Sequence, residues 1–461
     1  MAEEPHMMVP EWIEALARCV SAERVSTRSA DLDAASRDES SLPPSLPEAV
    51  VWPMSTQEVA AIVALALKHR IALTARGAGT SLEGNPIPGA GGIVVDFSRM
   101  DRVLEIRAAD LAVRVEPGVV YEKLNTALRP HGLFFPPSPG GSSDSATIGG
   151  MVANDASGIY SVKYGGTRDS VLAVTVVVGD GRVLRLGSDC RKTSSGYHLI
   201  GLVIGAEGTL GLVTEVTLRL RGIPAARRQL AVCFESERRA ADAIAAMMAY
   251  AIDLAAVELL DRRTIGALNR FRGYGLTERP TLFLEADGSA ASAAEAERAA
   301  LEVCAEHGGE RVELASGQNP WEVRHWTTRS IRATNPGTEI VRTDLAVPIS
   351  RLPEVVDESY RRGDETALAL YAFGHAGLGI LHVLIAERPQ DGVRWRAALA
   401  AKDAILRFVL SLGGTVSGEH GLGLGNRQYA ALEHGDSLAL MKQVKQVFDP
   451  HGILNPGKIW E

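Results

Sequence analysis

Four residues in the last quarter of the chain carry side chains that could do chemistry together. His375 and His382 lie in a glycine-rich stretch and in a predicted strand over residues 380–385, respectively. Glu419 and His420 follow between further glycines. Two histidine nitrogens and one carboxylate suit a divalent cation that keeps open coordination positions. A single histidine is more often a structural, hydrogen-bonded residue, so the combination carries the interpretation.

Glu419 and His420 are neighbours in the sequence. In an extended stretch, neighbouring side chains point to opposite sides. We therefore expect one of the two to face a metal ion and the other to face a substrate.

The composition indicates a large globular protein of two or three domains. The chain has 461 residues, of which 46% are hydrophobic and 23% charged. The net charge is -8 and there is no basic run, which argues against a nucleic-acid partner. The four cysteines form no CxxC pair, so neither a zinc ribbon, a disulfide framework nor an internal iron–sulfur carrier is expected. The acidic start and the lack of a long apolar run predict a cytoplasmic protein, or one peripheral at a membrane, without a transmembrane segment.

Changes in composition and in helix and strand signals divide the chain into four segments. Residues 1–45 look peripheral, and residues 46–222 alternate tightly between helix and strand signals. Ser55 to Glu58 reads as a capping box that opens a helix to about residue 69. Residues 223–411 look like a second α/β domain, and residues 412–461 are again rich in glycine.

A first glycine loop, Arg76 to Ser81, follows a predicted strand over residues 71–75. A dinucleotide-binding βαβ unit would need a helix next, but Pro86 and Pro88 exclude one. Consecutive backbone N–H groups can still form a concave nest for an anion. A simple tight turn is the competing interpretation.

Two further segments favour a ligand. Residues 146–154 and 205–211 combine glycines with small side chains, as expected where a backbone approaches another molecule closely. Three such loops within one domain indicate one extended ligand threaded between them. The pyrophosphate of FAD, with its two arms, fits that length.

Together, the motifs RGAGTS, ATIGG and GAEGTLGLVTEV and the C-terminal DPHGILNPGK resemble the vanillyl-alcohol oxidase and p-cresol methylhydroxylase superfamily. The resemblance runs from about residue 47 to 458. It is strongest to the branch of D-lactate dehydrogenase, the glycolate oxidase catalytic subunit and D-2-hydroxyglutarate dehydrogenase. It implies an α+β fold: a two-subdomain FAD-binding domain, an α/β substrate (cap) domain, and a C-terminal segment that returns to the FAD domain.

The resemblance also implies which residues bind FAD. The first loop would wrap the pyrophosphate, the second would lie along the ribityl chain and isoalloxazine, and the third would meet the adenine half. The first loop has no histidine, so we expect non-covalent FAD. The implied cofactor residues are Arg76, Gly77, Ala78, Gly79, Thr80, Ser81, Ala146, Thr147, Gly149, Gly150, Asn154, Gly158, Glu207, Gly208, Val213 and Asn455.

In the active site, the resemblance makes His375, His382 and Glu419 the ligands of a divalent metal, zinc or manganese, and His420 the catalytic base. The metal would bind the hydroxyl and carboxylate of a small 2-hydroxy acid, His420 would take the hydroxyl proton, and flavin N5 would take the C2 hydride. For the substrate carboxylate, the family spacing implies Arg324 with Thr328, and Arg342 in place of a lysine.

The chain departs from the family pattern at three positions, where Leu378, Ile380 and Leu384 replace an aspartate and two asparagines. An apolar wall disfavours a second carboxylate on the substrate and favours an alkyl group by about 0.8 kcal/mol per buried methylene. We expect these residues to line the substrate pocket, with lactate or longer D-2-hydroxy acids preferred over D-2-hydroxyglutarate. In the competing interpretation, the lost polar groups only oriented the metal ligands, and their loss weakens metal binding.

The sequence thus predicts an FAD-linked D-2-hydroxyacid dehydrogenase, similar to D-lactate dehydrogenase. D-2-hydroxyglutarate dehydrogenase or a glycolate oxidase catalytic subunit is the alternative. Other classes are an electron-relay flavoprotein subunit, a flavin-using transferase with a histidine run that is not found here, and a flavin-free metal hydrolase. The expected partners are an external electron acceptor (cytochrome, quinone or electron-transferring flavoprotein) and a second copy of the chain in a homodimer.

Overall fold

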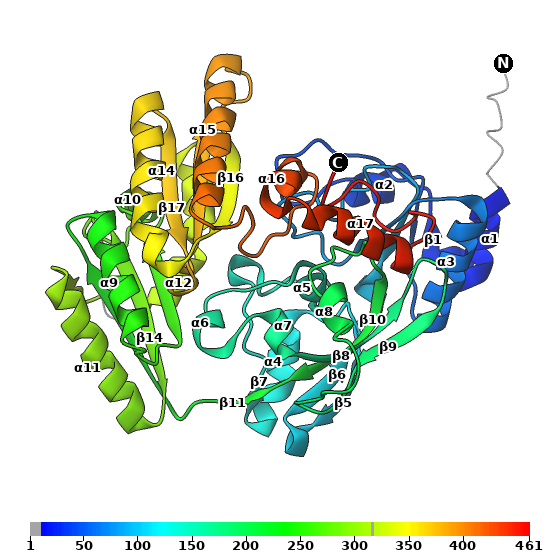
Figure 1. Cartoon of the computed structure of the whole chain (residues 1–461), viewed down its shortest axis with the longest axis horizontal. Helices are drawn as coiled ribbons and strands as arrows, with labels where there is room; N and C mark the ends of the chain where they lie inside the picture. The colour runs from blue at the N-terminus through cyan, green and yellow to red at the C-terminus, as the bar shows by residue number, and fades with distance from the viewer. Residues whose placement is uncertain (1–10, 315–317) are drawn as a thin grey trace.

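The computed structural model describes residues 11–314 and 318–461, so the first ten residues of the expected N-terminal segment lie outside the described residues. The chain forms three main β-sheets with helices against them, and its C-terminal segment runs between them (Figure 1). Within the described part, no helix is long and apolar enough to cross a bilayer.

Two of the main sheets come from the first half of the chain. In spatial order, the first contains β1 (Val25–Ser26), β2 (Ala49–Val51), β4 (Ile93–Asp96) and β3 (Leu73–Arg76). The second contains β5 (Val103–Arg107), β6 (Ala112–Val115), β10 (Leu212–Arg219), β8 (Val171–Val177) and β9 (Val183–Gly187). A short pair, β7 (Leu133–Phe134) and β11 (Arg221–Gly222), precedes the third main sheet along the chain. The helices are α1 (Glu11–Val20), α2 (Ser29–Ala35), α3 (Thr56–His69), α4 (Tyr121–Leu128), α5 (Ile148–Asn154), α6 (Ser161–Tyr164), α7 (Thr167–Ser170) and α8 (Ile200–Val203).

The predicted helix after Ser55 is confirmed as α3. The Ser55 hydroxyl accepts a hydrogen bond from the Glu58 amide at 3.2 Å, which satisfies one free N–H of the first turn. Val59, Ile62, Val63 and Ala66 are buried against the four-stranded sheet. This packing fixes the sheet whose strand β3 leads into the glycine loop.

The third main sheet has seven strands with antiparallel neighbours. Its order is β15 (Glu310–Arg311), β12 (Ala226–Cys233), β14 (Thr281–Gly288), β13 (Ala256–Leu260), β17 (Ala369–Gly374), β18 (Ile380–Glu387) and β16 (Glu339–Ala346). One face packs against α9 (Glu237–Ala249), α11 (Ala290–Glu306), α14 (Leu352–Thr366) and α15 (Gly392–Ser411). The other packs against α10 (Arg262–Arg272), α12 (Pro320–His325) and α13 (Thr327–Thr334).

Strand β18 shows how this sheet positions a polar residue. Leu381, Val383 and Ile385 pack into the core on the side of α9, α11, α14 and α15. Because side chains alternate along a strand, His382 points to the opposite face of the sheet, together with Leu384. In the sheet register, His382 lies opposite Asp344 on β16 and Phe373 on β17. Side chains directly opposite in an antiparallel pair are neighbours. The register therefore brings an acidic residue to His382.

The C-terminal segment connects the seven-stranded sheet to the four-stranded sheet that contains β3. Thr415 forms a bridge with Ala346 at the end of β16, and Leu454 forms a bridge with Leu73 at the start of β3. Between them lie α16 (Ala430–His434) and α17 (Ser437–Phe448), drawn in orange-red and red over the first domain in Figure 1. The expected return of this segment to the first domain is confirmed.

One sequence expectation needs correction. Residues 146–154 are not a glycine loop, because Ile148 to Asn154 form α5. Thr147 is the N-cap and accepts a hydrogen bond from the Gly150 amide at 3.4 Å. Glycines in the first turn of so short a helix hid the helical signal. The helix still presents its N-terminal end to the same place as the other two segments.

Candidate active site

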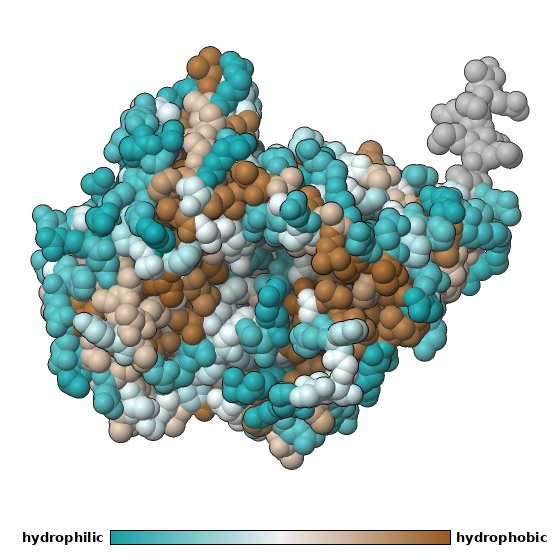
Figure 2. Space-filling model, viewed as in Figure 1, coloured by the Kyte–Doolittle hydropathy of each residue, from teal (hydrophilic) through white to brown (hydrophobic). Residues whose placement is uncertain are grey.

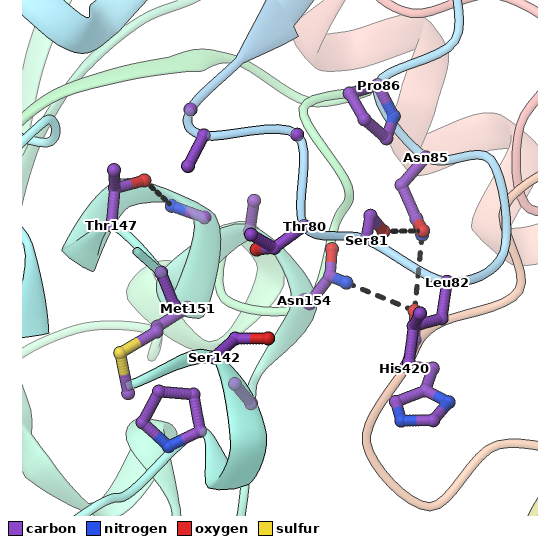
Figure 3. Close-up of a pocket in the computed structure, with 18 of the residues that line it drawn as sticks. Thr80, Ser81, Leu82, Asn85, Pro86, Ser142, Thr147, Met151, Asn154 and His420 are labelled. Carbon is purple, nitrogen blue, oxygen red and sulfur yellow. Dashed lines mark hydrogen bonds between the residues drawn. The ribbon is translucent and has the colours of Figure 1, made fainter. Parts of the chain in front are cut away.

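The three glycine-containing segments meet around one cavity (Figure 3). The loop after β3, the start of α5 and the turn at Glu207 form most of its wall, and Glu419 and His420 reach it from the C-terminal segment. A molecule in this cavity therefore lies beside the predicted histidine and carboxylate cluster. The expected cofactor residues that line it are Gly77, Ala78, Gly79, Thr80, Ser81, Ala146, Thr147, Gly150, Asn154, Glu207 and Gly208.

Five other expected cofactor residues are not among the residues that line this cavity. Gly149 packs against Pro117, where a Cβ atom would lie 2.5 Å from the proline Cβ. Gly158 has φ +148°, and a Cβ atom would lie 1.5 Å from the Ser138 carbonyl oxygen. These two glycines let neighbouring loops approach each other. The five residues are Arg76, Gly149, Gly158, Val213 and Asn455.

Glu207 fastens the C-terminal segment beside the cavity. Its carboxylate accepts hydrogen bonds from the Leu422 and Gly423 amides at 2.7 and 2.9 Å and from the Asn85 side chain at 2.6 Å. The Asn455 side chain donates to the Glu207 and Asn85 carbonyl oxygens at 2.6 and 3.1 Å. Burial raises the pKa of Glu207 above its usual value, while these donors act in the opposite direction. Asn85 was missed because, just before Pro86, it looked like part of a helix breaker.

Replacing Glu207 with alanine is expected to destabilise the fold and weaken FAD binding. The change leaves two buried amides without an acceptor, at about 1 to 3 kcal/mol for each. Thermal unfolding and FAD titration measure the effect, with the exposed Glu122→Ala as control. Glu207→Gln, which keeps one acceptor oxygen, should lose less than Glu207→Ala. Equal thermal stability of the alanine and glutamine variants would contradict this role.

His375, His382 and Glu419 form one compact cluster. Glu419 Oε1 lies 3.3 Å from His375 Nε2 and 3.4 Å from His382 Nε2. The two imidazole rings are perpendicular, with centroids 5.6 Å apart. All three donor atoms lie within 4.8 Å of one another. This donor set suits a divalent cation with open positions.

Two buried carboxylates behind the cluster were missed by the sequence reasoning. Glu258 on β13 lies 2.6 Å from His375 Nδ1, and Asp344 Oδ1 lies 3.4 Å from His382 Nδ1. Both carboxylates are fully buried. A metal-ligating histidine usually offers its other ring nitrogen to a carboxylate, which fixes the ring and its tautomer. The arrangement around His375 and His382 has that form.

The charges of the cluster favour a protonated imidazole where a cation would bind. Burial disfavours a charged imidazole, but the carboxylates of Glu258 and Glu419 outweigh it and raise the pKa of His375 to about 10. Burial also opposes ionisation of Glu419, yet the two histidines hold the pKa of its carboxyl well below the usual range. Metal binding to such a site displaces the proton.

The main chain of His420 is held from both sides. Its amide donates to Asp344 Oδ2 at 2.7 Å, and its carbonyl oxygen accepts from the side chains of Asn154 and Asn85 at 3.0 and 3.3 Å (Figure 3). Its ring stacks on His382 with centroids 5.1 Å apart. Burial, which outweighs the attraction of Asp344, lowers the pKa of His420. A neutral imidazole fixed at a cavity wall can accept a proton.

The expectation that Glu419 and His420 point to opposite sides is wrong. Residues 418–420 form a bend rather than an extended stretch. Glu419 Oε1 and His420 Nε2 lie 3.9 Å apart, and both residues line the same cavity.

Of the two arginines expected at the substrate carboxylate, Arg324 is already paired. Its Nε donates to Glu258 at 2.7 Å, and its guanidinium lies 4.9 Å from the ring centre of Phe373. It is thus linked through Glu258 to His375. Thr328 is half-buried on α13, the helix that follows.

Arg342 is better placed to receive an anion. It lies two residues before Asp344 on β16, so both side chains leave the same face of the strand. Arg342 lines a further cavity together with Leu82, which also borders the cofactor cavity.

The three apolar replacements are packed rather than open to a cavity. Leu384 is buried in a core cluster with Phe373, and Ile380 would contact a Cβ atom at Gly418 at about 3.0 Å. Leu378 is half-buried beside them. None of the three is among the residues that line the cavities described here.

The fold and this site define a class of protein. Residues 47–187 match the family model of an FAD binding domain, and residues 223–459 match that of FAD linked oxidases, C-terminal domain. The chain belongs to the FAD-linked oxidase family.

Individual relatives are similar over most of the chain. The chain is 37% identical to the D-lactate dehydrogenase (cytochrome), mitochondrial, of Arabidopsis thaliana, over 90% of this chain and 73% of that protein. It is 31% identical to the glycolate oxidase subunit GlcD of Bacillus subtilis, over 90% and 89%. The solved structure of 4-ethylphenol oxidase from Gulosibacter chungangensis covers 97% of both chains with a TM-score of 0.80 at 19% identity. That likeness shows the same fold.

Proposed function

We propose that this protein oxidises a D-2-hydroxy acid to the 2-oxo acid with non-covalently bound FAD, assisted by a divalent metal. The relatives named D-lactate dehydrogenase and glycolate oxidase subunit support this substrate class. The observation that carries the proposal is the position of His420. Its imidazole stands at the wall of the cofactor cavity and stacks on one of the candidate metal ligands.

In this proposal, each residue has a separate task. His420 takes the proton of the substrate hydroxyl at a ring nitrogen. His375, His382 and Glu419 hold a zinc or manganese ion, which polarises that hydroxyl when bound. The residues that line the cofactor cavity would hold FAD, which would supply the acceptor for the C2 hydride. Arg342 pairs with the substrate carboxylate.

FAD is expected to leave the polypeptide on denaturation. Residues 77–81 line the cavity with glycines and small side chains, and this loop contains no histidine for a covalent bond. The purified protein should be yellow, and acid precipitation should release the flavin into the supernatant. Flavin absorbance that remains with the precipitated polypeptide would contradict non-covalent binding.

The substrate is identified by anaerobic bleaching of the flavin band with a panel of D- and L-2-hydroxy acids. We expect D enantiomers to bleach it, as the relatives named D-lactate dehydrogenase suggest. The expected advantage of D-2-hydroxybutyrate over D-2-hydroxyglutarate in kcat/KM rests on the sequence pattern alone, because Ile380 and Leu384 line none of the described cavities. A tenfold advantage for the diacid would mean that Arg342 receives a second carboxylate. Flavin that no 2-hydroxy acid bleaches would favour a relay subunit over a dehydrogenase.

A further inference from the structure

A second cavity, here called the α17 cavity, lies between α8, residues 415–422 and the helices α16 and α17. Hydrophobic side chains gather on the surface over α17 and α8 (Figure 2), and Leu440 at the cavity is 61% exposed. Large apolar residues from α8, α17 and the C-terminus contribute to the lining. These residues are Leu202, Leu440, Met441, Val444, Ile459 and Trp460.

The α17 cavity shares part of its wall with the cofactor cavity. Asn154, Glu207 and Glu419 line both. A molecule in the α17 cavity is thus separated from a molecule in the cofactor cavity by a single layer of side chains. That separation allows electron transfer without contact between the two molecules.

The lining does not match that of a substrate site. Of the candidate metal and substrate residues, Glu419 lines the α17 cavity but Arg342, His375 and His382 do not. Arg342 and His382 lie on the seven-stranded sheet and His375 directly follows β17, whereas the described residues that line the cavity come from other elements. The substrate's reacting carbon must lie by His420, which lines the cofactor cavity.

The charged groups in the lining are largely paired already. Arg168 and Asp155 form a salt bridge, and the Arg168 amide also donates to Asp155 at 2.9 Å. Glu433 accepts a hydrogen bond from the Val416 amide at 3.2 Å. A charged ligand would have to break these pairs, so the cavity suits a neutral and largely apolar molecule.

We infer that the α17 cavity binds the electron acceptor, a neutral lipophilic quinone. Reduced FAD gives two electrons and two protons, the two carbonyl oxygens of the quinone become the hydroxyls of the quinol, and FAD returns to its oxidised form. His434 and Trp460 are among the lining residues, and their rings carry N–H groups, the kind of donor that a quinone oxygen accepts. The inference rests on the proposed function only for the natural source of reduced FAD.

The test reduces the flavin of the holoenzyme with dithionite, so that no hydroxy acid is needed, and follows its anaerobic reoxidation by ubiquinone-1. Met441→Trp fills the cavity, while Val447→Trp makes the same kind of change on the same helix at a position that is 69% exposed and outside the lining. We expect reoxidation that saturates with ubiquinone-1 and falls at least tenfold in Met441→Trp. Val447→Trp should stay within twofold of wild type, as should reoxidation of both variants by ferricyanide.

Equal quinone rates in the two variants, or no reoxidation of the wild type by ubiquinone-1, would overturn the inference. Efficient cytochrome c reduction by both variants alongside such a result would assign the acceptor to a protein. If Met441→Trp loses FAD, Leu440→Asp tests the same wall from the surface with the same readouts. Failure of the proposed function is distinguished by the separate hydroxy-acid bleaching assay, because the dithionite experiment does not depend on it.

Discussion

Replacing His420 with alanine is expected to slow flavin reduction by a D-2-hydroxy acid on the order of 100- to 10,000-fold, the usual contribution of a general base. No other histidine takes its position in the described part of the cavity wall, because His375 and His382 turn their Nε2 atoms to Glu419. The rate is measured by anaerobic stopped-flow absorbance of the flavin band.

FAD and metal content separate this effect from damage to the site. Both should remain near wild type in His420→Ala, because the Asp344, Asn85 and Asn154 contacts use the main chain of residue 420. The exposed His451, which contacts Arg70, provides a matched control as His451→Ala. A loss below tenfold in a fully loaded His420→Ala enzyme would remove His420 as the base.

Removal of the metal is expected to lower the rate of flavin reduction by about 100-fold or more while FAD stays bound. A cation that polarises the substrate hydroxyl contributes several kcal/mol to the reaction. The cofactor cavity is formed mainly by other segments of the chain, so FAD should not leave with the metal. Chelation followed by metal analysis, kinetics and readdition of zinc or manganese measures the effect.

Two variants locate the metal within the cluster. His382→Ala should not recover activity with added metal, and Asp344→Asn should bind metal about 10- to 100-fold more weakly, because Asp344 stands behind His382. Full turnover by a preparation that elemental analysis shows to be metal-free would exclude a catalytic metal. The His375, His382 and Glu419 cluster would then be a structural hydrogen-bonded group.

The sequence was sufficient to predict residues that belong to compact motifs. The glycine loop of residues 76–81 and the pair Glu419 and His420 stand in short stretches whose residue types point to close backbone approach or to chemistry. These motifs are typical of one fold, and that fold brings the segments together around the cavity. The amphipathic helix α3 could also be predicted from the sequence, because its cap and its apolar face are local features.

Residues whose role depends on strand register were not predicted. Asp344 reaches His382 only because β16 and β18 pair at that position. Glu258 reaches His375 because β13 pairs with β17, the strand that ends just before His375. In the sequence, each is a single acidic residue inside a mostly apolar strand. An acid in a fully buried strand such as β13 is costly without a partner, and that cost is the signal that could have identified it.

The surroundings of the three apolar replacements and of Glu207 also depend on contacts between distant segments. Leu384 and Ile380 pack within the structure, which their position in a motif did not reveal. Glu207 is expected to meet the adenine half of FAD, and its further role was not predicted: its carboxylate holds the amides of Leu422 and Gly423, more than two hundred residues away in the sequence. Contacts between distant segments are fixed by the fold rather than by the local pattern.

The central claim, oxidation of a D-2-hydroxy acid by the FAD of this chain, is tested most directly by single-turnover reduction of the flavin. The holoenzyme is mixed anaerobically with D-2-hydroxybutyrate, with its L enantiomer, and with the D acid that carries deuterium at C2. We expect bleaching by the D acid with stoichiometric 2-oxobutyrate, slower bleaching by the deuterated acid, and little bleaching by the L enantiomer. A metal-loaded holoenzyme whose flavin stays oxidised with D-2-hydroxybutyrate and with every other 2-hydroxy acid would contradict it.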